Sequence, residues 1–270
     1  MNIKQKNKIK TMLSSKIIFD EPLMNHTSFG IGGPASCFIY PNNREELSIL
    51  LQYAKKENIS VSFFGSGSNV LVWDKGFDGI VISLRKTFKN LTINSSYQII
   101  AESGVMLGNL VKKTIHSNIK GLESLIGVPG TLGGALIMNA GAFGDEISNY
   151  FIEAKTMTIE GKIKTYKKNQ ITFSYRNSTF PKNEILIEAT FNCHQGISSR
   201  IQEDKQKASL SRKTKQPLKF RSAGSVFKNP SNTLAAGYLI DKTGLKGIKK
   251  GGACISKKHA NFILNIDNAL

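Results

Sequence analysis

Residues 127–144 read Gly-Val-Pro-Gly-Thr-Leu-Gly-Gly-Ala-Leu-Ile-Met-Asn-Ala-Gly-Ala-Phe-Gly, with six glycines in eighteen positions around an apolar centre. The apolar centre distinguishes this stretch from a low-complexity linker. Glycine permits positive φ angles and a close approach of the backbone to a ligand. A turn that opens into a short helix also aims free N–H groups at an anion. The stretch therefore predicts a loop that binds a diphosphate.

A second loop of similar character, Gly65-Ser-Gly-Ser-Asn-Val-Leu71, follows the apolar run 61–64, which is typical of a buried strand. It is not a Rossmann fingerprint, because Val70 stands where the third glycine would be, and no Gly-Lys-Ser/Thr follows as in a P-loop. By itself the segment would be read as a serine-rich turn between two strands. Together with residues 127–144, it predicts one large ligand held by two phosphate-binding loops.

The order of expected elements favours a mixed fold. Residues 35–40 predict a strand, and Asn43 with Glu46 predicts a capping box that begins a helix. Short β-like runs alternate with turns between residues 151 and 191, and a polar helix follows from about 199 to 215. Because strands and helices do not alternate strictly, we expect an α+β fold rather than a doubly wound sheet.

The length of 270 residues predicts two domains. We expect the lysine-rich residues 1–20 to form a disordered tail, residues 21–197 to form one domain and residues 198–270 to form a second, smaller one. Near the start, the longest apolar stretch spans residues 17–19, which is too short for a signal peptide or a membrane span. The three cysteines are far apart, and neither they nor the four histidines have metal-ligand spacing. These features predict a cytoplasmic protein with no disulfide, no metal and no membrane association.

The formal charge of +18 raises the possibility of nucleic-acid binding. Only six of the 37 basic residues are arginine, however, and the lysines are scattered along the whole chain. The scatter favours a drift in composition over a binding face. We therefore expect no nucleic-acid partner, although an anionic substrate would benefit from the charge.

Six markers along the chain resemble the UDP-N-acetylenolpyruvoylglucosamine reductase family of flavoenzymes, and they occur in the order of that family. The resemblance runs from about Asn25 to Ala269. The markers are Asn25-His-Thr-Ser-Phe29 with Ile31-Gly-Gly-Pro-Ala35, Gly65-Ser-Gly-Ser-Asn69, Gly127-Val-Pro-Gly-Thr131 with Met138-Asn-Ala-Gly141, Ser174-Tyr-Arg-Asn-Ser178, Gly224-Ser-Val-Phe-Lys-Asn-Pro230 and Ile266-Asp-Asn-Ala269.

The resemblance implies a two-lobed FAD-binding domain of the vanillyl-alcohol-oxidase type, followed by a smaller α+β domain that binds the substrate. It implies that NADPH, a co-substrate, reduces a non-covalently bound FAD. The reduced flavin then reduces the enolpyruvyl group of a UDP-sugar, and the product is UDP-N-acetylmuramate for peptidoglycan synthesis. We also expect the protein to be a monomer. The implied cofactor residues are Gly65, Ser66, Gly67, Ser68, Asn69, Gly127, Gly130, Thr131, Asn139, Gly141 and Ala142, and those for the UDP phosphates are Lys215, Lys228 and Asn229.

Two catalytic residues are implied as well. Hydride delivery to the β-carbon of an enol ether places negative charge on the adjacent carboxylate, and this charge needs a fixed cation or acid nearby. Arg176 is a candidate because a guanidinium meets a carboxylate in a bidentate fork, although without the family pattern it would be read as a turn residue. By resemblance, Ser225 donates the proton to the second carbon, with backbone N–H groups and Lys228 near enough in sequence to stabilise the alkoxide.

One departure from the family pattern keeps alternatives open. The family continues beyond the Asp-Asn-Ala segment to a strand that carries a third catalytic residue, a glutamate. The given sequence ends at Leu270, before that position. The alternatives are therefore a catalytically impaired FAD-binding remnant of the family and another FAD-dependent oxidoreductase of the same fold.

Overall fold

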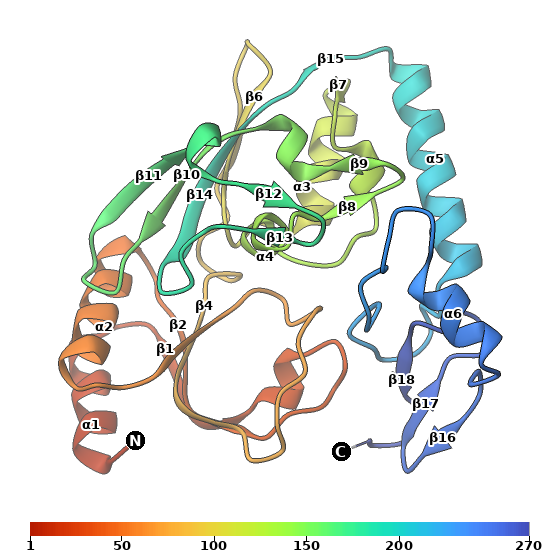
Figure 1. Cartoon of the computed structure of the whole chain (residues 1–270). Helices are drawn as coiled ribbons and strands as arrows, with labels where there is room; N and C mark the ends of the chain where they lie inside the picture. The colour runs from red at the N-terminus through yellow and green to blue at the C-terminus, as the bar shows by residue number, and fades with distance from the viewer. Residues whose placement is uncertain (270) are drawn as a thin grey trace. The chain divides into compact units, whose positions relative to one another are not determined.

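The computed structural model describes residues 1–269, which form two compact units (Figure 1). Unit 1 contains residues 1–21, 35–66 and 78–209, and unit 2 contains residues 22–34, 67–77 and the chain from 210 onward. The two units are interleaved along the chain, whereas the sequence predicted a single domain boundary after residue 197. Two early loop segments pack with the C-terminal part of the chain, and a linear reading of composition does not detect such pairing.

The first lobe of unit 1 is a four-stranded sheet covered by two helices. Its strand order is β1 (Lys16–Pro22), β2 (Pro34–Tyr40), β4 (Phe77–Ser83) and β3 (Val61–Phe64). Strands β3 and β4 run parallel, with Val61 opposite Ile80. Helices α1 (Ile3–Met12) and α2 (Arg44–Lys56) supply Ile9 and Leu47 to the same buried cluster as Ile39 and Ile82. This packing explains the apolar face that α2 carries in the sequence.

The N-terminal segment is ordered, so the expectation of a disordered tail is wrong. Asn2 Oδ1 accepts a hydrogen bond from the N–H of Gln5 at 2.9 Å, and Gln5 Oε1 accepts one from the N–H of Asn2 at 3.0 Å. This capping box begins α1, whose Ile9 is fully buried. The lysine-rich composition of this segment predicted disorder, although the segment contains a capping box and a buried residue. Ile9 is the one residue of α1 that is buried.

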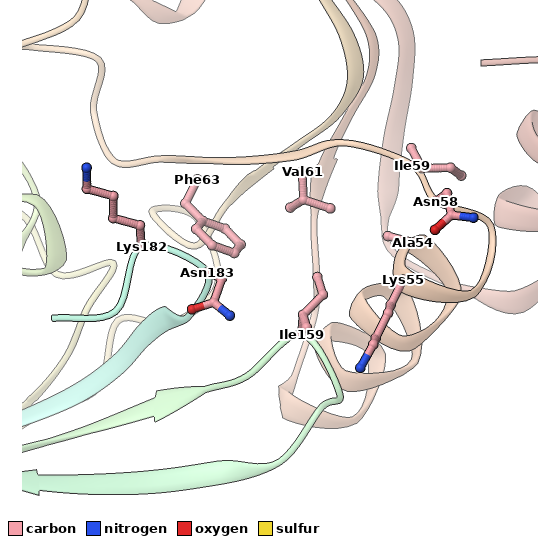
Figure 2. Close-up of a pocket in the computed structure, with 9 residues that line it drawn as sticks. All are labelled: Ala54, Lys55, Asn58, Ile59, Val61, Phe63, Ile159, Lys182 and Asn183. Carbon is pink, nitrogen blue, oxygen red and sulfur yellow. The ribbon is translucent and has the colours of Figure 1, made fainter.

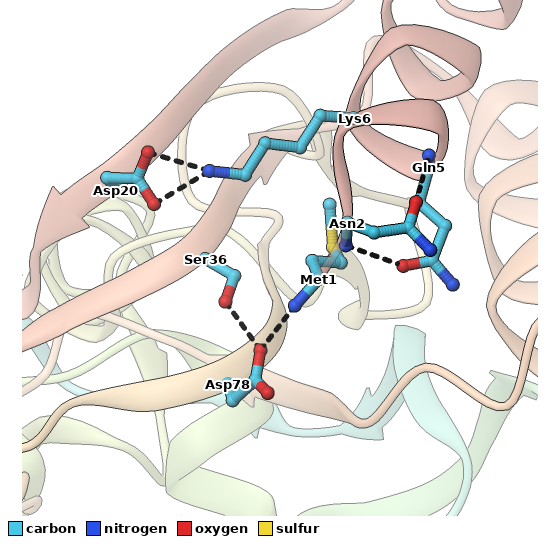
Figure 3. A network of polar contacts seen from close by, with 7 residues as sticks. All are labelled: Met1, Asn2, Gln5, Lys6, Asp20, Ser36 and Asp78. Carbon is cyan, nitrogen blue, oxygen red and sulfur yellow. Dashed lines mark hydrogen bonds and ion pairs between the residues drawn. The ribbon is translucent and has the colours of Figure 1, made fainter.

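Ion pairs fix the ends of this segment further. Figure 3 shows the terminal amino group of Met1 paired with Asp78 Oδ1 at 2.7 Å, while Ser36 donates to the same oxygen. Lys6 on α1 reaches Asp20 on β1 at 2.7 Å. The terminal amino group is therefore tied to β4, and α1 is tied to β1.

The second lobe of unit 1 is a five-stranded antiparallel sheet. Its strand order is β11 (Ile163–Lys167), β10 (Phe151–Met157), β14 (Ile185–Asn192), β6 (Gln98–Glu102) and β5 (Leu91–Ile93). Helices α3 (Leu107–His116) and α4 (Leu132–Ile137) bury their apolar residues in the same core as these strands. The two lobes with their separate cores confirm the expected α+β class.

Short elements complete unit 1. They are β7 (Ile119–Lys120), β8 (Gly141–Ala142), β9 (Asp145–Glu146), β12 (Phe173–Ser174), β13 (Asn177–Ser178) and β15 (His194–Gln195), with the 3-10 turns η2 (Glu123–Leu125), η3 (Ile147–Tyr150) and η4 (Lys168–Gln170). Helix α5 (Ser198–Lys215) begins in unit 1 and ends in unit 2.

Unit 2 is built on a small antiparallel sheet of β16 (Lys249–Lys250), β17 (Ala253–Ile255) and β18 (Ile263–Asn265). It also contains α6 (Ala236–Lys242) and the turn η1 (Leu23–His26). Asn265 donates from Nδ2 to the carbonyl oxygen of Phe29 at 3.0 Å. This bond joins the early segment 22–34 to the C-terminal sheet. Across residues 1–269, no helix has the length and apolar character needed to cross a membrane.

Candidate active site

The two glycine loops meet in unit 1. Gly65 directly follows β3, and Thr131 is the N-cap residue of α4. A Cβ atom added to Gly65 would lie only 2.5 Å from Thr131 Oγ1. The loops that the sequence places 60 residues apart are therefore in direct contact.

The glycine loop 127–131 is anchored to the first residue of α3. Gly127 and Gly130 have φ angles of +75° and +142°, which favour glycine. The carbonyl oxygen of Gly130 accepts a hydrogen bond from the N–H of Leu107 at 2.9 Å. The loop is thus a fixed part of the fold.

One expectation about this loop is wrong. The first N–H groups of α4 do not point freely at an anion, because three of them have partners within the protein. Leu132 donates to Val105 O, Gly133 donates to Ser103 O, and Gly134 donates to Thr131 Oγ1. The N-terminus of α4 therefore presents no free N–H group at residues 132–134.

The other loop is divided between the two units. Gly65 and Ser66 belong to unit 1, whereas residues 67–69 belong to unit 2 and lie beside residues 26–28. Gly67 has a φ angle of +69°, and a Cβ atom there would come within 2.8 Å of Thr27 Cα. The N–H of Ser28 donates to the carbonyl oxygen of Gly67 at 2.9 Å. Gly67 is thus required by its backbone conformation and by its close neighbours.

Arg176 lies in the tight turn between β12 and β13, with a φ angle of +54°. Its Nη2 donates to the carbonyl oxygen of Gly141 at 2.7 Å, and its Nη1 donates to that of Asn139 at 3.4 Å. Its guanidinium carbon is 5.0 Å from the ring centroid of Tyr175. The fold therefore brings Arg176 of one sequence marker against Asn139 and Gly141 of another.

Arg176 carries a charge that its neighbours do not neutralise. Both of its hydrogen-bond acceptors are uncharged carbonyl oxygens. No carboxylate among residues 1–269 forms an ion pair with it. A half-buried, pre-oriented guanidinium without a counter-ion is suited to an anionic ligand.

Asn139, at the far end of α4, is fully buried and has a φ angle of +41°. Its Nδ2 donates to Glu146 Oε2 at 2.6 Å and to the carbonyl oxygen of Ser174 at 3.1 Å. Its Oδ1 is buried without a partner. Ala142, the last predicted cofactor residue, pairs with Asp145 in the β8–β9 ribbon.

Ser225 lies in unit 2, in a segment that the backbone and the buried side chain of Asn261 hold together. Asn261 O accepts from the N–H of Val226 at 3.0 Å, and Asn261 Oδ1 accepts from the N–H of Phe227 at 2.9 Å. Gly224 has a φ angle of +81°, and the position of its absent Cβ atom is open space. The side chain of Ser225 is exposed and accessible to a ligand.

The three residues expected at the UDP phosphates are exposed. Lys215 ends α5, and Lys228 follows the segment that Asn261 holds. Asn229 has a structural contact as well, because its Oδ1 accepts from the N–H of Ala236 at the start of α6 at 3.1 Å. Only its amide nitrogen remains available for a phosphate.

A separate pocket of about 280 Å³ opens in unit 1 and contains none of the predicted site residues (Figure 2). An apolar floor lies between two lysines and two asparagines. The lining residues are Ala54, Lys55, Asn58, Ile59, Val61, Phe63, Ile159, Lys182 and Asn183.

Two residues that organise the site, Glu146 and Asn261, are not among those that the sequence motifs predict. Glu146 follows Gly144 by two positions, and a turn at that glycine could have predicted its pairing with Gly141. Asn261 had no signal, since its partners lie 34 residues earlier in the chain.

Comparison with known proteins identifies the family. Residues 35–167 match a family model described as an FAD binding domain. Residues 216–270 match the UDP-N-acetylenolpyruvoylglucosamine reductase C-terminal domain. The chain is 42% identical over 250 residues to UDP-N-acetylenolpyruvoylglucosamine reductase 2 of Bacillus cereus (strain ATCC 10987 / NRS 248), covering 92% of this chain and 81% of the relative.

The chain belongs to the UDP-N-acetylenolpyruvoylglucosamine reductase family. The crystal structure of the MurB enzyme from Thermus caldophilus is 31% identical and superimposes with a TM-score of 0.81, covering 95% of this chain and 90% of that one. An alkyldihydroxyacetonephosphate synthase structure, at 18% identity and a TM-score of 0.55 over 72% of this chain and 41% of its own length, shares the fold alone. The expected FAD-binding fold of the vanillyl-alcohol-oxidase type is thereby confirmed.

The residues present fit the FAD that the reductase family implies. A Cβ atom on Gly65 would collide with Thr131 Oγ1, so the two predicted cofactor loops lie in direct contact. The buried, unpartnered Oδ1 of Asn139 needs a hydrogen-bond donor that residues 1–269 do not supply.

Proposed function

We propose that this protein is an NADPH-dependent flavoenzyme that reduces UDP-N-acetylglucosamine enolpyruvate to UDP-N-acetylmuramate in peptidoglycan synthesis. The supporting observation is the arrangement in unit 1, where the two glycine loops touch and Arg176 is held by Asn139 and Gly141. The similarity to a UDP-N-acetylenolpyruvoylglucosamine reductase over 92% of the chain supports this reaction for the arrangement. We further propose a cytoplasmic monomer whose partners are these two small molecules.

The proposed cofactor residues divide by their structural role. The proposed glycines are fixed by the backbone, because Gly67, Gly127 and Gly130 have positive φ angles and a Cβ atom on Gly65 or Gly141 would meet protein atoms. The other proposed residues of the same segments are Ser66, Ser68, Asn69, Thr131, Asn139 and Ala142. When bound, FAD supplies a two-electron carrier between NADPH and the enolpyruvyl group. The protein's residues orient the reactants, stabilise the negative charge that develops on the substrate and supply the proton that completes the reduction.

Arg176 is proposed to bind the carboxylate of the enolpyruvyl group. As hydride reaches the β-carbon, negative charge accumulates on that carboxylate and the α-carbon. A guanidinium fixed by two carbonyl oxygens stabilises this charge without reorienting. The missing counter-ion leaves its full charge available to the substrate.

Ser225 is proposed to deliver the proton to the α-carbon, which completes the reduction. The main-chain bonds to Asn261 hold the segment, so the hydroxyl is presented from a fixed backbone. Lys215, Lys228 and the amide nitrogen of Asn229 are proposed to bind the UDP phosphates, since all three are exposed donors of unit 2.

The function is tested by two half-reactions monitored at the flavin absorption band. We expect purified protein to be yellow, anaerobic NADPH to bleach it, and UDP-N-acetylglucosamine enolpyruvate to restore the colour with formation of UDP-N-acetylmuramate. Protein without flavin would contradict the proposal. A flavin that NADPH bleaches but only oxygen restores would favour the impaired remnant or an oxidase.

A further inference from the structure

Asn139 presents a buried polar atom with no role inside the protein. The residue has no exposed surface, and both donor positions of its amide nitrogen are used. The carbonyl oxygen has no partner among the described residues. Because a buried acceptor without a donor is costly, a donor from a bound water or ligand would stabilise this oxygen.

Glu146 determines which way this amide points. An ionised carboxylate can only accept hydrogen bonds, so it must face the nitrogen of Asn139, as the 2.6 Å contact to Oε2 shows. The carbonyl oxygen of Ser174 at 3.1 Å imposes the same orientation. Reversing the amide would bring its oxygen against two acceptors. The oxygen of Asn139 is therefore locked away from Glu146.

Glu146 also belongs to the structure that holds Arg176. Its backbone pairs with Gly141 in the β8–β9 ribbon, and the carbonyl oxygen of Gly141 accepts the shorter Arg176 bond. A Cβ atom on Gly141 would lie 2.8 Å from Glu146 Cγ and 3.3 Å from Arg176 Nη1. One carboxylate thus packs against the segment that fixes both the amide and the guanidinium.

The position of Asn139 relative to the glycine loop suggests the partner. Helix α4 separates Thr131 from Asn139 with six residues, a length of about 9 Å. An extended dinucleotide that places its diphosphate at the loop is long enough to bring another polar group past the far end of this helix. The partner required at that end is an N–H or O–H donor.

We propose that Glu146 is a positioning residue that locks the Asn139 amide, so that Asn139 Oδ1 accepts a hydrogen bond from a donor group of the bound flavin. The inference rests on the proposed function only in requiring FAD. It needs neither NADPH nor the UDP-sugar, so it can be tested by flavin binding alone.

The test measures the dissociation constant and visible spectrum of FAD bound to the full chain after flavin removal. We expect Glu146→Leu and Asn139→Leu each to raise the dissociation constant about tenfold, the typical worth of one hydrogen bond to a ligand. Glu146→Gln should bind within about twofold of wild type, because a glutamine oxygen can still accept from Asn139. Glu160→Gln, a surface carboxylate paired with Lys55, is the control and should bind like wild type.

Asn139→Asp adds a readout that a general loss of stability would not produce. Its carboxylate would face the Glu146 carboxylate, so its pKa should lie above the usual value for aspartate. FAD should therefore bind this variant poorly at pH 8 and better at pH 5.5, where protonation restores a donor toward Glu146. The wild-type dissociation constant should change less over the same range.

Several results would overturn the inference. Unchanged FAD binding by Asn139→Leu would mean that the oxygen meets only water. If Glu146→Gln and Glu146→Leu weakened FAD binding equally, Glu146 would act through its charge and not by orienting the Asn139 amide. If Glu146→Leu does not fold, the Gln variant and the pH response of Asn139→Asp still decide. A wild-type protein that binds no FAD would refute both this inference and the proposed function.

Discussion

At the scale of single residues, Gly65 is a position where the fold leaves no room for a Cβ atom. Its missing Cβ atom would lie 2.5 Å from Thr131 Oγ1, and Thr131 cannot easily withdraw because it caps α4. We expect Gly65→Ala to push the two loops apart and to reduce the flavin that copurifies with the protein severalfold. The ratio of flavin to protein absorbance measures this directly.

A matched glycine variant separates the effect at the site from a general effect of alanine. Gly108 lies within α3, and a Cβ atom there would meet nothing within 4 Å. Gly108→Ala should retain its flavin and stabilise the helix by about 0.5–1 kcal/mol. Full flavin retention in Gly65→Ala would mean that the contact between the loops is not part of the cofactor site.

Ser225 offers a second prediction at this scale, because its proposed role affects only one half-reaction. Ser225→Ala should leave flavin reduction by NADPH nearly unchanged and slow flavin reoxidation by the enolpyruvyl substrate by about 10²- to 10⁴-fold. Stopped-flow absorbance can follow the two steps separately. Equal losses in both steps would make Ser225 a structural residue of the segment that Asn261 holds.

At the scale of elements, Glu46 joins the segment after α1 to the start of α2. Burial alone would raise the pKa of Glu46, but hydrogen bonds from Ser15, Ser14 and Asn42 outweigh it and lower the pKa to about 2. A carboxylate with a depressed pKa stabilises the fold fully above its unfolded value, which is 4.5. That stabilisation is lost as the pH falls from 4.5 towards 2.

We therefore expect Glu46→Gln to lower the free energy of unfolding by about 1–3 kcal/mol at pH 7. The difference from wild type should persist at pH 5.5 and shrink as the pH drops below 4.5. Urea unfolding of both proteins at several pH values measures it, and Glu203→Gln, at an exposed position of α5, serves as the control. A difference that stays constant down to pH 3 would show that Glu46 acts through packing instead of charge.

The same helix shows how far local sequence rules reach. The expected N-cap is present, since Asn43 Oδ1 accepts from the N–H of Glu46 at 2.9 Å. The reciprocal half of the expected capping box is not formed, because the Glu46 carboxylate binds residues 14, 15 and 42 instead. Sequence spacing predicted the bond within the helix, whereas the competing donors come from another segment. Local patterns cannot weigh such tertiary partners.

At the scale of the whole molecule, the division into two units could not be predicted from the sequence, because it depends on contacts between segments far apart in the chain. The glycine loops and the α+β class could be read from the sequence, since each depends on residues close together in the chain. Unit 2 combines residues 22–34 and 67–77 with the C-terminal part through bonds such as that from Asn265 to Phe29. Glu146 was missed for a related reason, as its importance comes from an amide orientation that only coordinates reveal.

The net charge of +18 leads to a prediction for the molecule as a whole. Scattered lysines make no single binding site, but their summed field attracts anions and raises association rates at low salt. NADPH is a polyanion, and the Debye length falls from about 30 Å at 0.01 M to about 10 Å at 0.1 M ionic strength. The second-order rate constant for flavin reduction by NADPH should therefore fall severalfold between these two conditions.

NADH supplies the matched control for this measurement, because it lacks one phosphate and carries less negative charge. Its rate constant, however small, should depend less steeply on salt than that of NADPH in the same stopped-flow experiment. The spectrum of bound flavin, recorded in parallel, checks that salt does not release the cofactor. Identical slopes for the two nucleotides would mean that salt acts on the protein's conformation, and a flat response for both would mean that the basic surface does not steer the co-substrate.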